Sequence, residues 1–269
     1  MKTEIDTLKY FGYVVLKNVY KIEELRKARS NLELLLRKSK NIWYPEKKDQ
    51  TIIKSCFIDQ PKFFLSLLEK PKIKKILNKI FDDGFTLQSM NASLAKPIRK
   101  KSFNLKKKVH VDSKILTPSF RNTITVGLAI PIDNFTEKNG ATKVWPFSHK
   151  SEVGPKDFLK YPKIKFPEPI NCCLNKGEAL IFLPNLWHSN GPNFTKKNRW
   201  AIFTFFNQWW IKPTWDFTKC GENFFNQLTE YQKKLLGFTY REPSMYSNKN
   251  YTKTNIKNLP KSYNKILND

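Results

Sequence analysis

The hydrophobic pattern of this chain changes its period near residue 85, and this change limits the folds that the chain can adopt. Before that point, apolar residues recur at helical spacing within residues 22–38 and 63–80, and Pro71 interrupts the second stretch. After it come four apolar or β-branched runs of strand length, at residues 86–95, 123–132, 177–183 and 200–210. Helices followed by strands predict a mainly β fold with flanking helices, a double-stranded β-helix (cupin-like jelly roll) backed by N-terminal helices.

The length of 269 residues is sufficient for one large domain or two small ones, and all-β folds reach this size as single units. We therefore expect one domain over residues 1–269. Its helical part spans about residues 1–84, its jelly-roll core about 85–212, and a C-terminal extension about 213–269. The extension contains one further predicted helix at residues 224–236.

The formal net charge of +26 suggests an anionic partner such as nucleic acid, but the distribution of the charge favours a plainer interpretation. Nearly all of it is lysine, spread from end to end and mixed with asparagine and isoleucine, as an AT-rich genome encodes at neutral surface positions. Phosphate-binding grooves favour arginine or clustered stripes instead. The densest basic runs, at residues 99–101 and 106–108, form either a solvated loop or an attraction for an anionic substrate. We expect a generic basic surface and no nucleic-acid partner.

The four cysteines are not expected to form a disulfide framework, since a chain of this size folds without one. Cys172 and Cys173 are adjacent, and on a strand they would point to opposite faces, so we do not expect them to bind one metal together. No apolar run reaches membrane-spanning length, and the first residues lack the apolar segment of a signal peptide. These features predict a cytoplasmic protein without a membrane partner.

Two of the three histidines lie in a pattern that is typical of a metal site. Side chains two residues apart point the same way on a strand but about 200° apart on a helix, so His110 and Asp112 can bind one ion only from an extended segment. The predicted strand at residues 177–183 leads to His188, the second imidazole. Two imidazoles and one carboxylate on one side of a metal, with open positions opposite, are the ligand set of non-haem Fe(II) oxygenases. We therefore predict that His110, Asp112 and His188 bind iron.

Arg199 follows His188 by eleven residues, and the intervening Ser-Asn-Gly-Pro-Asn is rich in turn-forming residues. We expect the chain to reverse there and to bring Arg199 back on a neighbouring antiparallel strand, beside the metal. A guanidinium group can bind a carboxylate through two parallel hydrogen bonds. The four residues together suit a keto-diacid cosubstrate that chelates the metal and places its far carboxylate on Arg199. No catalytic residue beyond the metal ligands is expected.

Each of these residues has a plainer alternative when it is taken alone. A His-x-Asp pattern occurs by chance in many chains, His188 can be a turn histidine, and Arg199 can be a surface charge. The third histidine, His149, is a rival ligand, but its turn-like surroundings favour a structural role. The order and spacing of the whole set are more specific than any one member.

These motifs resemble the phytanoyl-CoA dioxygenase family of Fe(II)- and 2-oxoglutarate-dependent oxygenases over most of the chain. The segments that carry the resemblance are Phe11-Gly-Tyr-Val-Val-Leu16, His110-Val-Asp112, Glu137-Lys-Asn-Gly-Ala-Thr142, Trp145-Pro-Phe-Ser-His-Lys150 and Gly177-Glu-Ala179 through Trp187-His-Ser-Asn-Gly191. Arg199 stands at the family's usual spacing for the arginine that binds the distal carboxylate of 2-oxoglutarate.

The resemblance implies that the protein uses Fe(II), O2 and 2-oxoglutarate to hydroxylate a small organic substrate, with release of succinate and CO2. It also implies that Asn190, two residues after the last histidine ligand, helps to hold the distal carboxylate. Asp112 supplies a carboxylate at the position where the halogenases of the family have a small residue that leaves room for chloride. This difference argues against a halogenase. A further departure is Phe147, where the family usually has glycine; if the backbone there has a positive φ, phenylalanine costs about 1 kcal/mol or more.

Two other kinds of function remain open from the sequence. The first is a non-catalytic binding protein on the same scaffold, for an anionic ligand or nucleic acid, because folds of this kind also host non-enzymes. The second is a zinc- or O2-dependent isomerase of the cupin type that does not use 2-oxoglutarate. The complete ligand set argues against the first function, and Arg199 argues against the second.

Overall fold

The structure is a computed structural model of the chain, and it describes residues 3–38, 42–43, 49–82, 84–99, 103–113, 123–160 and 167–239. The chain divides into two compact units: unit 1 comprises residues 1–54 and 91–203, and unit 2 comprises residues 55–90 and 204–269. Strands β4 (Phe85–Ala95) and β10 (Arg199–Gln208) each have residues in both units. The expectation of a single domain over the whole chain stays a prediction.

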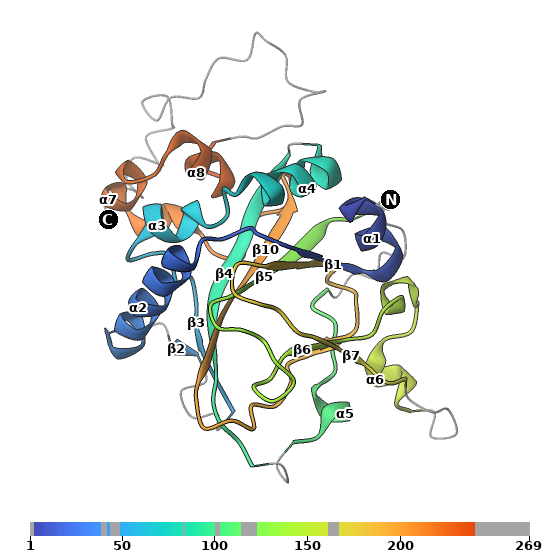
Figure 1. Cartoon of the computed structure of the whole chain (residues 1–269). Helices are drawn as coiled ribbons and strands as arrows, with labels where there is room; N and C mark the ends of the chain where they lie inside the picture. The colour runs from blue at the N-terminus through green and yellow to red at the C-terminus, as the bar shows by residue number, and fades with distance from the viewer. Residues whose placement is uncertain are drawn as a thin grey trace. The chain divides into compact units, whose positions relative to one another are not determined.

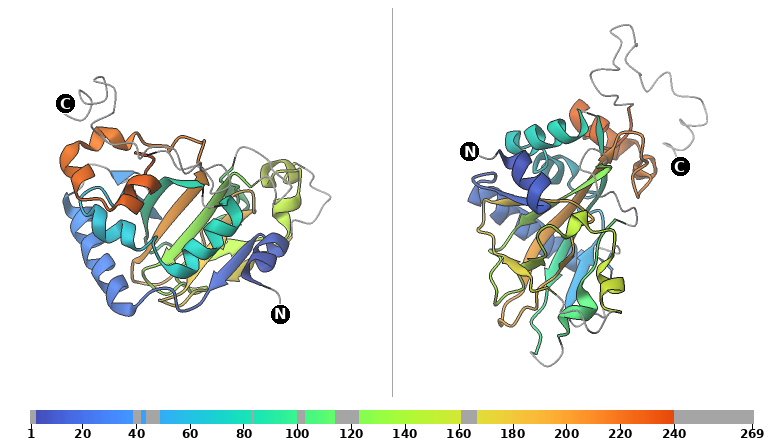
Figure 2. Two further views of the ribbon diagram at one scale, coloured as in Figure 1. Left: turned by 90° about the horizontal axis from the view of Figure 1, so that it is seen from above. Right: turned by 90° about the vertical axis from the view of Figure 1, so that its right-hand side faces the viewer.

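Unit 1 begins with α1 (Glu4–Phe11), β1 (Tyr13–Leu16) and the long helix α2 (Ile22–Lys38). The Thr3 side chain accepts a hydrogen bond from the Asp6 N–H and the Asp6 carboxylate accepts one from the Thr3 N–H, so a capping box starts α1. Gly12 ends α1 with a left-handed backbone (φ 83°). Figures 1 and 2 both show α1 and β1 lying next to each other at the start of the chain.

The apolar face of α2 is buried, as its helical periodicity predicted; its buried apolar residues are Leu25, Ala28, Leu32 and Leu35. Short helices α5 (Leu105–Lys108) and α6 (Pro155–Phe158) and a 3-10 helix (Ser148–Lys150) complete the helical part of unit 1 within the described residues.

Two antiparallel sheets form the β part of the molecule (Figure 1). The large sheet has seven strands in the order β1-β8-β5-β10-β4-β3-β2, and the small sheet has three strands in the order β7-β6-β9. The strands not yet given are β2 (Ile42–Trp43), β3 (Gln50–Ile53), β5 (Thr125–Pro131), β6 (Thr142–Val144), β7 (Ile170–Cys172), β8 (Ala179–Phe182) and β9 (His188–Ser189). All four predicted strands are present, and the fold is the predicted double-stranded β-helix with flanking helices.

One expectation about the strand order is wrong. Arg199 opens β10, whose neighbours are β5 and β4 in the large sheet, whereas His188 opens β9 in the small sheet. The chain therefore changes sheets between the two residues, and Arg199 does not return on a strand that neighbours His188. The turn-forming residues between them indicate a reversal, but they do not specify which sheet the returning strand joins.

A ring on the large sheet contacts one of the predicted metal ligands. Phe182 on β8 lies opposite Gly127 on β5, where an added Cβ atom would overlap the ring. Because Gly127 leaves this space open, the Phe182 ring fits against the sheet, with its centroid 5.4 Å from that of the His188 ring. The large sheet therefore contacts the small sheet at His188, through Phe182 of β8.

Unit 2 packs short helices around aromatic side chains. Its helices are α3 (Pro61–Ser66), α4 (Pro71–Phe81), α7 (Glu222–Asn226), α8 (Glu230–Leu235) and a 3-10 helix at Phe217–Cys220. The Phe57 ring contacts the rings of Phe217 and Phe224, at centroid distances of 5.4 and 6.2 Å. Pro71 occupies the first turn of α4, so the interruption predicted at this residue is the start of a new helix.

The single helix predicted at residues 224–236 is wrong, because the structure divides it into α7 and α8. Thr229 lies between them, and its side chain accepts a hydrogen bond from the Gln232 N–H while the Gln232 side chain accepts one from the Thr229 N–H. This capping box starts a second helix. The apolar periodicity continues through both helices, so it gives no sign of the cap that separates them. The remainder of the predicted extension, residues 240–269, lies outside the described residues.

The cysteines are free thiols; Cys172, the last residue of β7, is buried, and Cys173, which follows the strand, is exposed. Burial raises the pKa of the Cys172 thiol to about 12. None of the helices in the described part of the chain has both the length and the apolar character needed to cross a membrane.

Candidate metal centre

The backbone brings His110 and His188 together although they are far apart in the sequence. The His110 N–H donates to the His188 carbonyl (2.9 Å), and the His188 N–H donates to the His110 carbonyl (3.0 Å). The Asp112 N–H donates to the Pro184 carbonyl (2.8 Å). The segment around His110 is therefore extended and pairs with β9, as the His-x-Asp spacing required.

The side chains of the three predicted ligands converge. Asp112 Oδ1 lies 3.4 Å from His110 Nε2, and Asp112 Oδ2 lies 3.1 Å from His188 Nε2. One potential ligand atom from each residue lies within 4.8 Å of the others, and among the described residues these three form the group that could hold a metal ion. Ligand atoms about 2.1 Å from one ion and at about 90° to each other lie about 3 Å apart. The separations of the three side chains thus suit a shared ion.

Hydrogen bonds orient both imidazole rings. His110 Nδ1 lies 2.9 Å from the Lys108 carbonyl oxygen, and His188 Nδ1 lies 2.9 Å from the Leu186 carbonyl oxygen. A carbonyl oxygen can only accept, so each Nδ1 carries a hydrogen and Nε2 is the ring atom that faces Asp112. A proton on Nε2 donates to the carboxylate, and its loss frees the lone pair that binds a metal. A metal-binding histidine usually donates the N–H of its other ring nitrogen to such an acceptor, which fixes the orientation of the ring.

The electrostatics of the group favour a charged carboxylate. Burial acts to raise the pKa of the Asp112 carboxyl, but the charges of His188 and His110 and the hydrogen bonds from both rings hold it well below its usual range. Burial acts to lower the pKa of His188, but the Asp112 carboxylate raises it above its ordinary value. His188 is buried, whereas the side chain of His110 is 42% exposed. The group is therefore open to solvent on the His110 side.

Arg199 lies buried at the start of β10, with 2% of its surface exposed. Its Nη2 donates to the Gly140 carbonyl oxygen (2.8 Å), and its Cζ lies 4.3 Å from the centre of the Phe135 ring. Nε and Nη1 are buried without a hydrogen-bond partner within the described residues. Burial lowers the pKa of Arg199 to about 10, and the nearby Asp133 carboxylate acts in the opposite direction. A charged group with unpartnered donors therefore lies inside the protein.

Thr142 and Asn190 lie on the same face of the small sheet as His188. The pairing of β6 with β9 places Val144 opposite His188, and its continuation places Thr142 opposite Asn190. The Thr142 Oγ1 atom is buried without a partner in the described part of the chain. The sequence predicted Asn190 but not Thr142, although its place two residues after the Asn-Gly turn was a usable signal.

His149 is not part of the group of three ligands. Its Nε2 lies 3.0 Å from the Lys9 carbonyl oxygen, and an added Cβ atom at Gly12 would lie 2.5 Å from its Nδ1. Burial lowers the pKa of His149. The ring packs under the end of α1, which is a structural position.

Phe147 has the left-handed backbone that the resemblance suggested, with φ 69°. Its ring is 45% exposed and contacts the rings of Tyr10 and Phe11, at centroid distances of 5.3 and 5.2 Å. Its N–H donates to the Phe11 carbonyl (3.2 Å). The Phe147 ring therefore packs this turn against α1, while its left-handed backbone is strained.

A pair of substitutions separates the strain at Phe147 from its ring contacts. Phe147→Ala removes the contacts and keeps a side chain in the left-handed region, whereas Phe147→Gly removes the same contacts and relieves the strain. We expect the glycine variant to be more stable than the alanine variant by about 1 kcal/mol in the free energy of unfolding, measured with urea. Equal stabilities would show that the backbone there is not strained.

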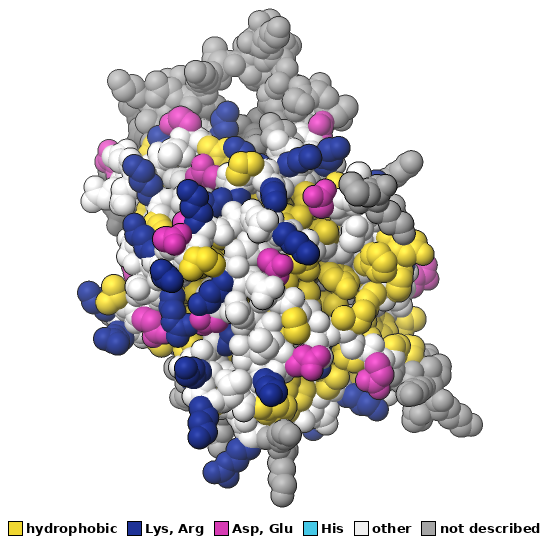
Figure 3. Space-filling view, viewed as in Figure 1, with side chains coloured by type: hydrophobic (Ala, Val, Ile, Leu, Met, Phe, Trp, Pro, Cys, Tyr) yellow, Lys and Arg dark blue, Asp and Glu magenta, His cyan; other side chains and the backbone are white. Residues whose placement is uncertain are grey.

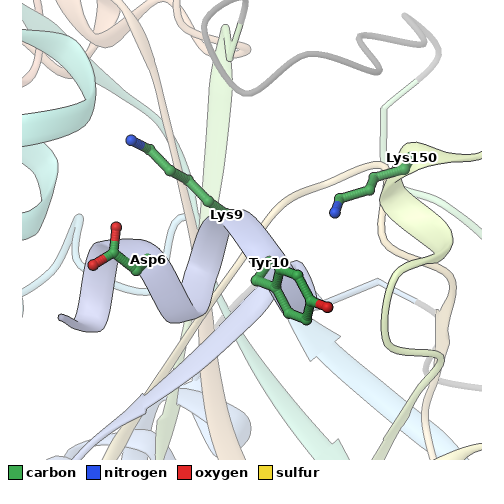
Figure 4. A pocket seen from close by; sticks show the side chains of 4 residues that line it. All are labelled: Asp6, Lys9, Tyr10 and Lys150. Carbon is green, nitrogen blue, oxygen red and sulfur yellow. The ribbon is translucent and has the colours of Figure 1, made fainter. Parts of the chain in front are cut away.

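A surface pocket of about 310 Å³ lies at α1 and is lined by Asp6, Lys9, Tyr10 and Lys150, so none of the three predicted metal ligands lines it (Figure 4). The Lys150 ammonium lies 4.8 Å from the centre of the Tyr10 ring. Asp6 is the lining residue that could bind a metal, and it also caps α1. The pocket therefore does not offer a second metal site.

On the face of the molecule that Figure 3 shows, the basic side chains do not gather into one stripe. Figure 3 shows Lys and Arg side chains spread over the visible face, with Asp and Glu side chains between them. Lys106 and Lys107 on α5 are exposed, and Lys108 pairs with Asp49 (2.6 Å). Lys100 and Lys101, from the other predicted basic run, lie outside the described residues. The expectation of a generic basic surface without a nucleic-acid partner stays a prediction.

Comparisons with known proteins agree with the fold and the motifs. The model of the phytanoyl-CoA dioxygenase family (PhyH) matches residues 8–201. The chain is 24% identical over 250 residues to the uncharacterized protein Rv1501 of Mycobacterium tuberculosis, covering 88% of this chain and 86% of that protein.

Two solved structures share the fold at low sequence identity. The epimerase SnoN, in complex with Fe3+, alpha ketoglutarate and nogalamycin RO, has a TM-score of 0.62 at 14% identity and covers 76% of this chain and 82% of its own. HygX from Streptomyces hygroscopicus, with nickel and 2-oxoglutarate bound, has a TM-score of 0.62 at 12% identity and covers 79% of this chain and 89% of its own.

Proposed function

The chain belongs to the phytanoyl-CoA dioxygenase family, and from this membership we propose that it is an Fe(II)- and 2-oxoglutarate-dependent dioxygenase. We propose that it hydroxylates a small organic substrate and releases succinate and CO2. The observation that carries the proposal is the convergence of His110, Asp112 and His188 in the same unit as a buried arginine with unpartnered donors.

His110 and His188 would hold the iron through Nε2, and Asp112 through a carboxylate oxygen. The donor set suits the ion, because two imidazoles and one carboxylate leave the remaining positions open for cosubstrate and O2. Bound iron supplies the oxidising chemistry with O2 and 2-oxoglutarate. The chain's own contribution is to fix the ligands from two backbone-paired segments and to orient both rings through Nδ1.

Arg199 would bind the distal carboxylate of 2-oxoglutarate. Burying a guanidinium group with two unpartnered nitrogens is costly, so the charge needs an anionic partner inside the protein. A carboxylate satisfies both its charge and its donors. The buried Thr142 hydroxyl and Asn190 share a face of the small sheet and would complete the anchor.

An anaerobic titration tests the proposal. Fe(II) followed by 2-oxoglutarate should produce a weak visible charge-transfer band that saturates at one equivalent of each, and admission of O2 with a substrate from a metabolite screen should then release succinate. Failure to bind both iron and 2-oxoglutarate, together with salt-sensitive binding of DNA or RNA, would favour a non-catalytic binding protein. Zinc binding and isomerase activity without 2-oxoglutarate would favour the cupin-type alternative.

The Thr142 hydroxyl provides a smaller test of the same anchor. Thr142→Val keeps the shape of the side chain and removes one buried donor, so we expect the dissociation constant of 2-oxoglutarate to rise by about 5- to 10-fold. Thr142→Ser keeps the hydroxyl and should bind nearly as tightly as the wild type. The Fe(II) affinity should not change in either variant. Unchanged 2-oxoglutarate affinity in Thr142→Val would remove this residue from the anchor.

A further inference from the structure

The loop that follows β5 contacts Arg199 and its neighbour at three points. The Gly140 carbonyl oxygen accepts a hydrogen bond from Arg199 Nη2 (2.8 Å), and the Phe135 ring lies 4.3 Å from Arg199 Cζ. The third point is Asp133, which contacts the backbone of Trp200, the residue after Arg199. The first two contacts hold the guanidinium group, and the third acts on the strand that carries it.

Asp133 and Trp200 form a reciprocal pair. The Trp200 N–H donates to Asp133 Oδ2 (2.9 Å), and the Asp133 N–H donates to the Trp200 carbonyl (3.1 Å). The amide that donates to Asp133 belongs to the peptide that joins Arg199 to Trp200. Because this peptide is attached directly to the Arg199 Cα atom, its position determines where the arginine side chain starts and in which direction it leaves the strand.

Charged groups hold Asp133 in turn. Its carboxylate is 16% exposed, accepts a hydrogen bond from Arg29 of α2, and lies 3.6 Å from the Lys176 ammonium. The Trp200 indole N–H donates to Glu33 of α2 (2.7 Å). Alternation along β10 sends Trp200 to the face opposite Arg199, so α2 fixes the strand from behind.

We propose that Asp133 is a positioning residue for 2-oxoglutarate, one that acts through Arg199 and does not touch the cosubstrate. The inference rests on the function proposed above. The Asp133 carboxylate also favours the charged form of the buried arginine, because it raises the pKa that burial lowers. Asp133 thus holds both the place and the charge of the group that receives the distal carboxylate.

Two substitutions separate the contributions of Asp133. Asp133→Ala removes its charge and its hydrogen bond to Trp200, whereas Asp133→Asn removes the charge and keeps an acceptor of the same shape. We expect the dissociation constant of 2-oxoglutarate, measured anaerobically through the charge-transfer band, to rise by about 10-fold in the first and about 3-fold in the second. Asp157→Ala, which removes an exposed aspartate paired with Lys160, is the matched control and should leave the constant unchanged.

A shorter keto acid shows whether the Asp133 substitutions weaken 2-oxoglutarate binding through Arg199 or through the metal site. 2-Oxobutyrate carries the same metal-chelating group but lacks the distal carboxylate, so its affinity does not depend on Arg199. The Asp133 variants should therefore bind Fe(II) and 2-oxobutyrate as tightly as the wild type. If Asp133→Ala does not fold, the split between the two keto acids in Asp133→Asn decides the matter.

Three results would overturn the inference: unchanged 2-oxoglutarate affinity, equal loss of both keto acids, or loss of Fe(II) binding in the variants. These results differ from a failure of the proposed function, in which the wild-type protein itself would not bind 2-oxoglutarate. The inference fails alone if the wild type binds 2-oxoglutarate, Arg199→Met weakens that binding, and the Asp133 variants do not.

Discussion

Replacement of Asp112 by alanine is expected to abolish iron-dependent succinate formation. Asp112 is the residue that both imidazoles approach, at 3.4 and 3.1 Å, and it supplies the negative charge of the group. Loss of a group that only supports a metal ligand already costs about 10- to 100-fold in metal affinity, so loss of a ligand itself should lower the Fe(II) affinity by more than about 100-fold. The measurements are anaerobic Fe(II) titration and succinate release.

The comparison variant for this experiment is Asp157→Ala, which removes an exposed aspartate far from the ligand group in the sequence. It should keep wild-type iron affinity and turnover. His188→Ala should behave like Asp112→Ala, because the buried His188 ring has its Nε2 directed at the same carboxylate. Iron-dependent turnover at wild-type rates in Asp112→Ala would refute the assignment of the metal ligands.

Replacement of Arg199 by methionine should raise the dissociation constant of 2-oxoglutarate by about 100-fold, while Fe(II) and 2-oxobutyrate bind as before. The factor corresponds to about 2.8 kcal/mol, the size of one charge-assisted hydrogen-bonded contact in a buried site. Methionine fills much of the same volume and removes the charge. The dissociation constant of Arg199→Lys should lie between those of the wild type and Arg199→Met, since lysine keeps the charge but lacks the paired donors.

Arg199→Met should also show whether the arginine is needed for binding 2-oxoglutarate or for the stability of the fold. The arginine is 2% exposed and has two unpartnered nitrogens, so it destabilises the protein when no anion is bound. Arg199→Met should therefore unfold at a urea concentration no lower than that of the wild type when 2-oxoglutarate is absent. With a redox-inert metal bound to both proteins, addition of 2-oxoglutarate should stabilise the wild type more than the variant at the same concentration. A large loss of stability in Arg199→Met would indicate a structural arginine instead.

Local patterns were sufficient for α2, for the four predicted strands and for the extended segment that carries His110 and Asp112. The periodicity of α2 predicts its buried face, and the spacing of His110 and Asp112 requires the extended segment that the structure has. Both inferences depend on residues that are close in the sequence. The position of Arg199 in the large sheet depends on strand order, which turn chemistry between residues 189 and 199 does not specify.

The residues that sequence reasoning missed act through distant partners. Asp133 matters because its carboxylate meets the Trp200 amide and a helix about a hundred residues earlier in the chain. Thr142 becomes notable because its hydroxyl is buried without a partner, and a threonine on a strand is otherwise unremarkable. For Asp133 the informative fact is a tertiary contact, and for Thr142 it is the lack of a hydrogen-bond partner within the described residues. Neither fact produces a periodic pattern in the sequence.

The reciprocal backbone hydrogen bonds between His110 and His188 do not depend on any ion. We therefore expect the metal site to form without the ion, so that metal binding requires dehydration of the cation more than rearrangement of the polypeptide. A chelator should strip the ion and leave the far-ultraviolet circular dichroism unchanged, in contrast to zinc fingers, which unfold when their metal is removed. Cobalt or nickel should then enter the stripped protein readily and provide inert forms for ligand studies.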